Sequence, residues 1–498
     1  MTVWDLVVAA AGERPERVVF ADSHGRSLTT VELRDAAERV AAGLDVTAGQ
    51  FVSWQLPTVL ESVVLLVALA RVGAVQNPII PILREREVGS IVDQIGTSLL
   101  VVPETWRGFA HGDMARALAT DRGFGVLTID LEGAIGDALR LPAGDPSTLR
   151  RPPADDGECR WIYFSSGTTA APKGVRHTDA SVIASSRGMT DHLGIGDGDV
   201  YPIAWPVTHI GGVTMIASVL RAGGRLVLFD GFDPATIGDA MAAVRPTLLG
   251  TGVPFFRAYL DAQRRHGDAP LYPALRAFTA GGAPTPPELV HELVDVFGVH
   301  VVSSWGLTEF PIATCASPSD PADQLVSTVG RASPGVRVRV VDGELRLKGP
   351  QCFTGYVDAT LDAGAFDDDG WFRTGDLGEV DADGFVTITG RLKDVIIRNG
   401  ENISALELED VLLRHPDVAD VAVIGLPDAR TGERVCAVVV AVPDRTVTLD
   451  VIAAHCAAQG LARQKTPEQV ELVAAIDRNP MGKVVKSDLQ ARILSSRR

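Results

Sequence analysis

The sequence lacks the features that mark disulfide-stabilised or metal-binding proteins. Its cysteines are odd in number and scattered, and no two of them have the spacing of metal ligands. A chain of 498 residues also needs no disulfides to stabilise its core. A reduced, cytoplasmic protein is therefore expected. The cysteines are Cys159, Cys315, Cys352, Cys436 and Cys456.

Long apolar runs are also missing. The most apolar stretch, residues 63–70, ends at Arg71 and is far shorter than the roughly 20 residues that span a membrane. At the N-terminus no basic segment is present, and the acidic Asp5 precedes a short apolar patch. We therefore expect neither a signal peptide nor stable membrane insertion.

The chain has fewer basic residues than acidic ones. The 46 basic residues are outnumbered by 63 acidic ones, which gives a net charge of −17. Proteins that bind nucleic acids or anionic membranes broadly carry a basic surface, so these two classes are excluded. Any polyanionic substrate must then be bound by a few local cationic groups.

The first part of the chain alternates helix and strand patterns. Thr29 and Glu32 form a capping box ahead of apolar residues at helical spacing. A strand pattern at 51–56 is followed by a helix pattern at 58–72 and a buried strand pattern at 98–102. The same alternation returns after residue 180, and it is typical of parallel sheets covered by helices.

The pattern changes between about residues 326 and 390. Short strand patterns at 336–341, 344–348 and 385–389 are accompanied by Asp-Gly turns, which predicts an antiparallel barrel or sandwich. A compact α+β pattern then follows, with helices at 405–414 and 449–459 and strands at 418–424, 435–442 and 469–473.

We therefore expect an α/β plus β fold of two domains. The large N-terminal domain, residues 1–391, would contain two parallel-type α/β subdomains and a small β-barrel. Residues 392–498 would form a smaller α+β C-terminal domain.

The strongest local signal is a strand pattern at 161–164 that runs into a loop rich in hydroxyls and glycine. Backbone N–H groups and hydroxyls of such a loop donate to phosphate oxygens, and a lysine supplies a point charge. The alternative is an ordinary polar surface loop, and the Walker P-loop pattern is absent. The loop reads Ser165-Ser166-Gly167-Thr168-Thr169-Ala170-Ala171-Pro172-Lys173-Gly174.

This loop resembles the signature of the adenylate-forming superfamily, which includes acyl-CoA synthetases, peptide-synthetase adenylation domains and beetle luciferases. Further segments resemble motifs of this family, in the same order, along nearly the whole chain. They are Gly281-Gly282-Ala283-Pro284, Ser303-Ser304-Trp305-Gly306-Leu307-Thr308-Glu309, Thr374-Gly375-Asp376, Gly390-Arg391-Leu392-Lys393-Asp394, Gly400-Glu401-Asn402-Ile403-Ser404 and Asn479-Pro480-Met481-Gly482-Lys483.

The resemblance implies a nucleotide site and its catalytic groups. Glu309 and Thr168 would hold Mg²⁺, Asp376 would bind the ribose, and Lys483 would be the mobile catalytic lysine, aided by Glu309, Thr308 and Lys173. Judged singly, Glu309 could be a surface glutamate, Asp376 a turn residue and Lys483 a solvated lysine. The implied ATP and AMP contacts are Ser165, Ser166, Gly167, Thr168, Thr169, Lys173, Gly281, Gly282, Ala283, Pro284, Ser304, Trp305, Gly306, Thr308, Asp376, Arg391 and Lys483.

The resemblance also implies sites for the acid and for coenzyme A. The acyl group is expected beside His209, Gly211, Gly212 and Gly281, although His209 could also be a satisfied core histidine. Gly211 and Gly212 leave space for a bulky or ring-containing acid. Coenzyme A is expected at Arg398, Gly400 and Glu401, after the C-terminal domain has rotated about Lys393.

Trp305 departs from the family pattern, because the usual residue there is a tyrosine. Any contact made by a phenolic hydroxyl at this position is therefore in doubt. The charged catalytic groups of the family are all retained.

The implied enzyme is an acyl-CoA synthetase that uses ATP, Mg²⁺ and coenzyme A, with a medium-chain, alicyclic or steroid-derived acid as substrate. A homodimer is left open as its assembly. The closest alternative is an adenylating enzyme that loads an acyl carrier protein and makes no free CoA thioester. A luciferase-like oxidase would emit light or consume oxygen, and a non-catalytic sensor is disfavoured by the retained charged residues.

Overall fold

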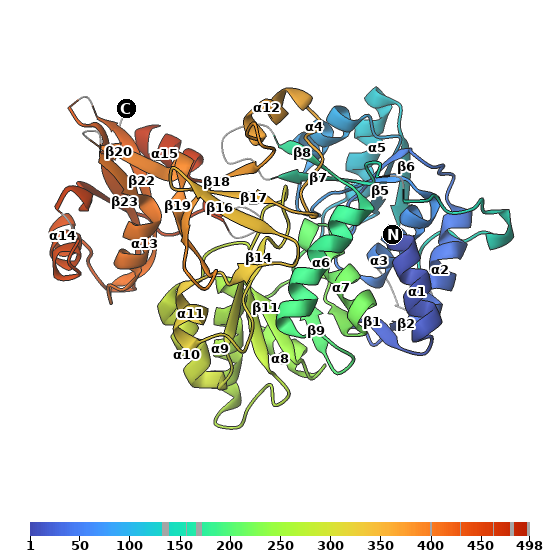
Figure 1. The fold of residues 1–498 in the computed structure, drawn as a ribbon, viewed down its shortest axis with the longest axis horizontal. Helices are drawn as coiled ribbons and strands as arrows, with labels where there is room; N and C mark the ends of the chain where they lie inside the picture. The colour runs from blue at the N-terminus through green and yellow to red at the C-terminus, as the bar shows by residue number, and fades with distance from the viewer. Residues whose placement is uncertain are drawn as a thin grey trace.

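The computed structural model describes residues 1–131, 139–155, 157–165, 172–398, 401–428, 430–461, 463–478 and 483–495. The early part of the chain and the C-terminal part lie at opposite ends of the longest axis, with an antiparallel sheet between them (Figure 1). Among the described residues, no helix has both the length and the apolar character needed to cross a membrane.

A six-stranded sheet in the order β6-β5-β3-β4-β7-β8 carries the predicted phosphate loop. Its neighbours pair in parallel except for β7 and β8, which are antiparallel. The strands are β3 (Phe51–Trp54), β4 (Val75–Pro78), β5 (Leu99–Pro103), β6 (Gly125–Ile129), β7 (Trp161–Ser165) and β8 (Lys173–His177).

Two further sheets complete the α/β part. One has the order β2-β1-β10-β9 and the other β11-β12-β13-β14-β15, and both contain parallel pairs. The strands are β1 (Val18–Asp22), β2 (Ser27–Thr29), β9 (Val200–Ile203), β10 (Arg225–Leu228), β11 (Leu248–Thr251), β12 (Ala277–Ala280), β13 (Val301–Trp305), β14 (Thr314–Cys315) and β15 (Arg331–Ala332).

Helices cover these sheets, as the alternating pattern predicts. The capping box at Thr29 is confirmed, because its hydroxyl accepts from Glu32 N and the Glu32 carboxylate accepts from Thr29 N. The helices are α1 (Val3–Glu13), α2 (Thr30–Gly43), α3 (Leu60–Val72), α4 (Glu85–Ile95), α5 (His111–Arg122), α6 (Asp179–Leu193), α7 (Ile210–Ala222), α8 (Ile237–Ala242), α9 (Val253–His266), α10 (Pro287–Phe297) and α11 (Ala322–Ser327).

The predicted antiparallel part is a four-stranded sheet whose order follows the chain. Asp342 and Gly343 both have positive φ angles, 52° and 79°, as the tight turn of a two-residue hairpin requires. Its elements are β16 (Arg337–Val341), β17 (Glu344–Lys348), β18 (Phe372–Val380) and β19 (Val386–Arg391), with the short α12 (Asp362–Ala365) before β18.

The C-terminal lobe has its own sheet, which begins after the turn Leu392–Asp394. Contacts that tie this lobe to the larger one include Ser404 Oγ, which donates to Thr389 O at 2.7 Å, and Arg414 Nε, which lies 3.0 Å from Glu288 Oε1 on α10. The lobe contains β20 (Val395–Arg398), β21 (Glu401–Ser404), α13 (Ala405–Leu413), β22 (Val418–Asp428), β23 (Gly432–Ala441), α14 (Leu449–Ala458), β24 (Gln469–Leu472) and α15 (Lys486–Ser495).

The expected fold class is therefore confirmed, with a large α/β and β part and a smaller α+β lobe. The division of the chain at residues 391 and 392 stays a prediction.

Helix α3 gives a direct test of the core, because every residue from Leu60 to Arg71 is buried. Leu66 is fully buried, so Leu66→Ala should cost about 2–5 kcal/mol of stability through lost contacts and a residual cavity. Val8 is 44% exposed, so Val8→Ala should change stability by less than about 0.5 kcal/mol. Urea denaturation followed by tryptophan fluorescence measures both, and equal midpoints for the two variants would contradict this account of α3.

Candidate active site

The β7–β8 hairpin holds both ends of the predicted phosphate loop. Ser165 and Lys173 are directly opposite each other in the antiparallel register, so the loop between them begins and ends at one point. A Cβ on Gly174 would lie 2.7 Å from the Val357 side chain, so this close approach requires glycine. The predicted nucleotide contacts Ser166, Gly167, Thr168 and Thr169 lie outside the described residues.

Thr308 and Glu309 occupy the tip of a tight turn after β13. Leu307 and Phe310 exchange two backbone hydrogen bonds, each 3.1 Å long, so the two residues between them project from the turn. His177 Nε2 lies 2.8 Å from Thr308 O and fixes the turn from β8. Burial lowers the pKa of His177 to about 4, so this imidazole is neutral at pH 7.

The Glu309 carboxylate and Lys173 meet at one tyrosine. Tyr356 Oη donates to Glu309 Oε1 at 2.9 Å, and Lys173 Nζ lies 5.3 Å from the centre of the same ring. Phe353 N also donates to Glu309 O at 2.9 Å. The end of the phosphate loop and the carboxylate expected to bind metal are thus neighbours, although they come from different strands.

Asp376 is buried between an indole N–H and a guanidinium group. Trp305 Nε1 donates to Asp376 Oδ2 at 2.8 Å, and Arg391 Nε lies 2.6 Å from Asp376 Oδ1. Asp376 and Arg391 are directly opposite each other on β18 and β19, so the ion pair follows from the register. The indole N–H of Trp305 therefore contacts the predicted ribose-binding residue, where the family pattern has a tyrosine.

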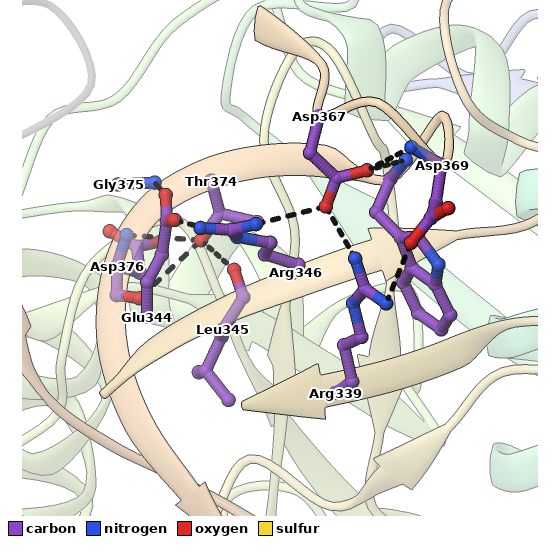
Figure 2. A network of polar contacts seen from close by, with 10 residues as sticks. Arg339, Glu344, Leu345, Arg346, Asp367, Asp369, Thr374, Gly375 and Asp376 are labelled. Carbon is purple, nitrogen blue, oxygen red and sulfur yellow. Dashed lines mark hydrogen bonds and ion pairs between the residues drawn. The ribbon is translucent and has the colours of Figure 1, made fainter. Parts of the chain in front are cut away.

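A chain of charged contacts supports the turn that carries Asp376 (Figure 2). Glu344 Oε1 accepts from Gly375 N at 3.1 Å, and its Oε2 accepts from Arg346 Nε at 2.9 Å. Arg346 lies between Glu344 and Asp367, and Nη1 donates to Asp367 Oδ2 at 2.9 Å.

Asp367 anchors the far end of this chain. Its burial disfavours the charged form, but the Trp371 amide and then the guanidinium groups of Arg346 and Arg339 outweigh that effect. The pKa of Asp367 consequently lies well below its usual value, and the carboxylate stays ionised as a fixed acceptor for both arginines.

The predicted adenine segment lies at the carboxyl end of β12, beside β13. Ser304 Oγ donates to Ala280 O at 3.2 Å, and a Cβ on Gly281 would lie 2.9 Å from Ser304 Oγ. Gly282 has a φ of 82°, which glycine adopts freely. Ala283 is half-buried and Pro284 is exposed. Crevices at the carboxyl ends of parallel strands are the usual ligand sites of such sheets.

Lys483 comes from the C-terminal lobe and joins these groups. Burial, and then the positive charge of Arg391, lower the pKa of Lys483 to about 8, while the charges of Asp376 and Glu309 act in the opposite direction. Desolvation and Arg391 also lower the pKa of Lys393, on which Asp376 and Lys173 act as well. Predicted groups from both lobes therefore share one electrostatic environment.

Residues 7–357 of the chain match the AMP-binding enzyme family, and residues 407–483 match the AMP-binding enzyme C-terminal domain. The chain belongs to the AMP-binding enzyme family. The predicted adenylate-forming, acyl-CoA synthetase type of enzyme is thereby confirmed, with the ATP, Mg²⁺ and CoA that such ligases use as co-substrates.

Relatives of this AMP-binding enzyme have different acids in their names. The medium-chain fatty-acid–CoA ligase of Escherichia coli strain K12 is 30% identical over 96% of this chain and 88% of that protein. The salicyl-AMP ligase / salicyl-S-ArCP synthetase of Mycobacterium tuberculosis strain H37Rv is 30% identical over 97% of this chain and 89% of that protein. The crystal structure of ATP bound MatB from Rhodopseudomonas palustris has a TM-score of 0.87 at 28% identity and covers 100% of both chains.

His209 is the N-cap of α7 in this AMP-binding enzyme. Its Nδ1 accepts from Gly211 N at 3.2 Å, so the proton of the neutral ring is assigned to Nε2. Desolvation, and then the positive charge of Lys483, lower the pKa of His209 to about 4, which keeps the ring neutral at pH 7.

The expectation that both glycines after His209 leave space for the acid needs a correction. A Cβ on Gly212 would lie 1.8 Å from Val207 O, so this glycine allows backbone packing and leaves no free space. At Gly211 the nearest atoms, His209 Nδ1 and the Trp205 ring, would lie at ordinary contact distances of 3.4 and 3.6 Å.

The residues predicted to contact coenzyme A lie on the C-terminal lobe. Arg398 forms two hydrogen bonds with Glu468, of 2.8 and 2.7 Å, at a cavity of about 870 Å³ that is also lined by Arg463 and Leu461. Glu401 is exposed, and its backbone lies opposite that of Arg398 in the antiparallel pair of β20 and β21. Gly400, also predicted to contact coenzyme A, lies outside the described residues.

Three positioning contacts were not predicted from the sequence: those of His177, Tyr356 and Glu344. His177 closely follows the phosphate loop, whereas Tyr356 and Glu344 lie far along the chain from every motif, and none of the three carries a pattern that marks its partner. For Glu344 the sequence offered one indication: Gly375 in the ribose motif marks a turn, and a backbone N–H in such a turn needs an acceptor.

Removal of the Glu344 carboxylate should raise KM for ATP, although Glu344 is not itself expected to contact the nucleotide. Glu344→Ala leaves Gly375 N without its acceptor, at a cost of about 1–3 kcal/mol, so KM for ATP should rise about tenfold. Steady-state kinetics measures this effect. Glu379→Ala, at an exposed position near the end of β18, is the control, and an unchanged KM in Glu344→Ala would show that the network does not support Asp376.

Proposed function

We propose that this protein is an ATP-dependent carboxylic acid–CoA ligase that first forms an acyl-adenylate and then an acyl-CoA thioester. The observation that carries the proposal is that the segment from β13 into its turn joins the predicted groups: Glu309 and Lys173 meet at Tyr356, and Trp305 donates to Asp376. Lys483, from the C-terminal lobe, lies close enough for the charges of Arg391, Asp376 and Glu309 to act on it. The roles below are proposed for these residues on the basis of their contacts.

Asp376 and Arg391 would bind the ribose. A carboxylate is a suitable acceptor for two neighbouring hydroxyl groups, and each oxygen of Asp376 keeps lone pairs beyond its contact with Trp305 or Arg391. Lys173, at the end of the predicted phosphate loop, supplies a positive charge for the triphosphate. The adenine would lie beside Gly281 and Ser304.

The donor set fits a magnesium ion. Mg²⁺ prefers carboxylate oxygens together with phosphate oxygens, and Glu309 offers Oε2 while Oε1 is engaged by Tyr356. Thr168 is the second proposed ligand. The ion would offset charge on the phosphate oxygens during adenylation.

In the first step an oxygen of the substrate carboxylate attacks the α-phosphorus of ATP. A new P–O bond forms, the bond to the bridging oxygen breaks, and pyrophosphate leaves with the electron pair. The residues need only hold the reactants and balance charge, so no covalent enzyme intermediate is required. Protonated Lys483 would stabilise the negative charge that develops on the α-phosphate and the bridging oxygen.

The acid would bind beside His209 and Gly211. The neutral imidazole can donate from Nε2 to a carboxylate oxygen, which would orient the acid toward the α-phosphorus. We propose a medium-chain, alicyclic or steroid-derived acid, as the family resemblance implies, bordered at Gly211 by His209 and the Trp205 ring.

In the second step the thiol of coenzyme A attacks the carbonyl carbon of the acyl-adenylate. A C–S bond forms, the C–O bond to AMP breaks, and the thiol proton is released. We propose that the C-terminal lobe, residues 392–498, rotates about Lys393 between the steps, and that Arg398, Gly400 and Glu401 then contact coenzyme A.

A carrier protein is the alternative acceptor, because a relative with similar coverage is named as both an AMP ligase and a carrier-protein synthetase. A panel of fatty, aromatic, alicyclic and steroid-side-chain acids, assayed with ATP and coenzyme A, separates the two cases. A soluble thioester formed without a carrier supports the proposal. Acid-dependent pyrophosphate exchange without any thioester would favour carrier loading.

We retain the cytoplasm as the proposed location, consistent with five free cysteines.

Replacement of Lys483 should separate the two half-reactions. Lys483→Ala should slow adenylation by on the order of 10²- to 10³-fold, because a charge aimed at the developing negative charge is lost. Thioester formation from supplied acyl-adenylate should be unchanged. Pyrophosphate exchange and thioester assays measure these rates, with Lys348→Ala as a control lysine variant; normal exchange in Lys483→Ala would refute its assignment.

The lowered pKa of Lys483 predicts a decline of adenylation at alkaline pH. A lysine with a pKa of about 8 holds its proton below that pH and loses it as the pH rises, so kcat/KM for ATP, which reports on the free enzyme, should fall above pH 8. Lys483→Arg stays protonated in this range, so its profile should lack this decline whatever its absolute rate. Parallel declines in both proteins would assign the titration to another group.

A further inference from the structure

The Glu309 side chain has one hydrogen-bond partner among the described residues, the hydroxyl of Tyr356. The bond is 2.9 Å long and leaves Oε2 without a hydrogen bond from the described part of the chain. A carboxylate at the tip of a turn can otherwise rotate, so the contact selects one orientation of Glu309. No sequence motif considered above includes Tyr356.

The tyrosine itself is rigidly held. Its ring packs edge-on against Phe353, with centroids 4.9 Å apart, and its backbone N–H donates to Asp362 Oδ1 at 2.8 Å. Its segment pairs with β8 through Arg176 N to Gly355 O and Val357 N to Gly174 O. Tyr356 is 5% exposed, and burial followed by the charge of Glu309 raises its pKa above the usual value, so the phenol keeps its proton and acts as a donor.

The ammonium group of the phosphate-loop lysine lies over the face of the same ring. Lys173 Nζ lies 5.3 Å from the ring centre, within the range in which an aromatic face attracts a cation. The hydroxyl of Tyr356 therefore contacts a carboxylate and its face contacts a cation. These two groups would lie on either side of the triphosphate and its metal ion.

We propose that Tyr356 is a positioning residue that orients Glu309 toward the metal–nucleotide complex and aligns it with Lys173. The proposal rests on the proposed function, because it assumes that Glu309 holds Mg²⁺ on the phosphates of ATP. Groups that hydrogen-bond to metal ligands fix their orientation, and their loss typically weakens metal binding by about 10- to 100-fold.

Binding of ATP with and without metal tests the proposal independently of turnover. Isothermal titration calorimetry measures the dissociation constant of ATP in Mg²⁺ and again in EDTA, and the ratio gives the gain in affinity from the metal. Tyr356→Phe removes the hydroxyl but keeps the ring over which Lys173 lies. The gain should fall about tenfold, while binding in EDTA stays at the wild-type value.

A matched control is Tyr272→Phe. Tyr272 is 4% exposed, and its hydroxyl donates to Gly238 O at 3.1 Å, so this variant also loses one buried hydrogen bond. It should keep the full gain. In a Glu309→Ala background, Tyr356→Phe should cause no further loss. A full gain in Tyr356→Phe, an equal loss in Tyr272→Phe, or an additive loss in the double variant would overturn the proposal.

Glu309→Asp gives a second test that leaves Tyr356 in place and applies even if Tyr356→Phe does not fold. The shorter side chain keeps its charge but cannot keep the 2.9 Å contact, so the metal-dependent gain should fall as in Tyr356→Phe. An undiminished gain would overturn the positioning role. If the wild-type protein shows no metal-dependent binding of ATP, the proposed function fails. If the wild-type protein gains affinity for ATP from the metal and both variants keep that gain, only the role of Tyr356 is refuted.

Discussion

The ion pair between Asp376 and Arg391 is the constraint on which the arrangement of the site depends. Asp376 is 2% exposed, and a buried carboxylate without a cation would be strongly destabilising. Its partner is the last residue of β19, and the C-terminal lobe begins after the short turn that follows it. The side chain that compensates the buried charge therefore also lies at the junction of the two lobes, where it influences Lys483.

The site gathers positively charged side chains, whereas the whole chain is acidic. The protein has a net charge of −17, yet Lys173, Arg391, Lys393 and Lys483 lie close enough to influence one another. Burial, and then repulsion by neighbouring cations, lower the pKa values of Lys393 and Lys483, and the negative charge of a bound polyanion would offset that repulsion. Local concentration of cations thus allows an acidic protein to bind a triphosphate, as the composition required.

Local patterns predicted much of the fold, because capping, turns and periodicity are set by neighbouring residues. The capping box at Thr29 and the turn at Asp342-Gly343 are examples. Contacts between distant residues were not predictable in this way: Tyr356 contacts Glu309 across 47 positions, and His177 contacts Thr308 across 131. Gly212 was misjudged because a glycine indicates either free space or close packing, and only the position of Val207 distinguishes them.

The most direct test of the account is a crystal structure of the protein with ATP and Mg²⁺. We expect the ribose on Asp376, the metal ion on Glu309 Oε2 and the ammonium group of Lys483 beside the α-phosphate, all in one complex. A nucleotide bound away from Asp376, or a metal ion without Glu309 among its ligands, would contradict it.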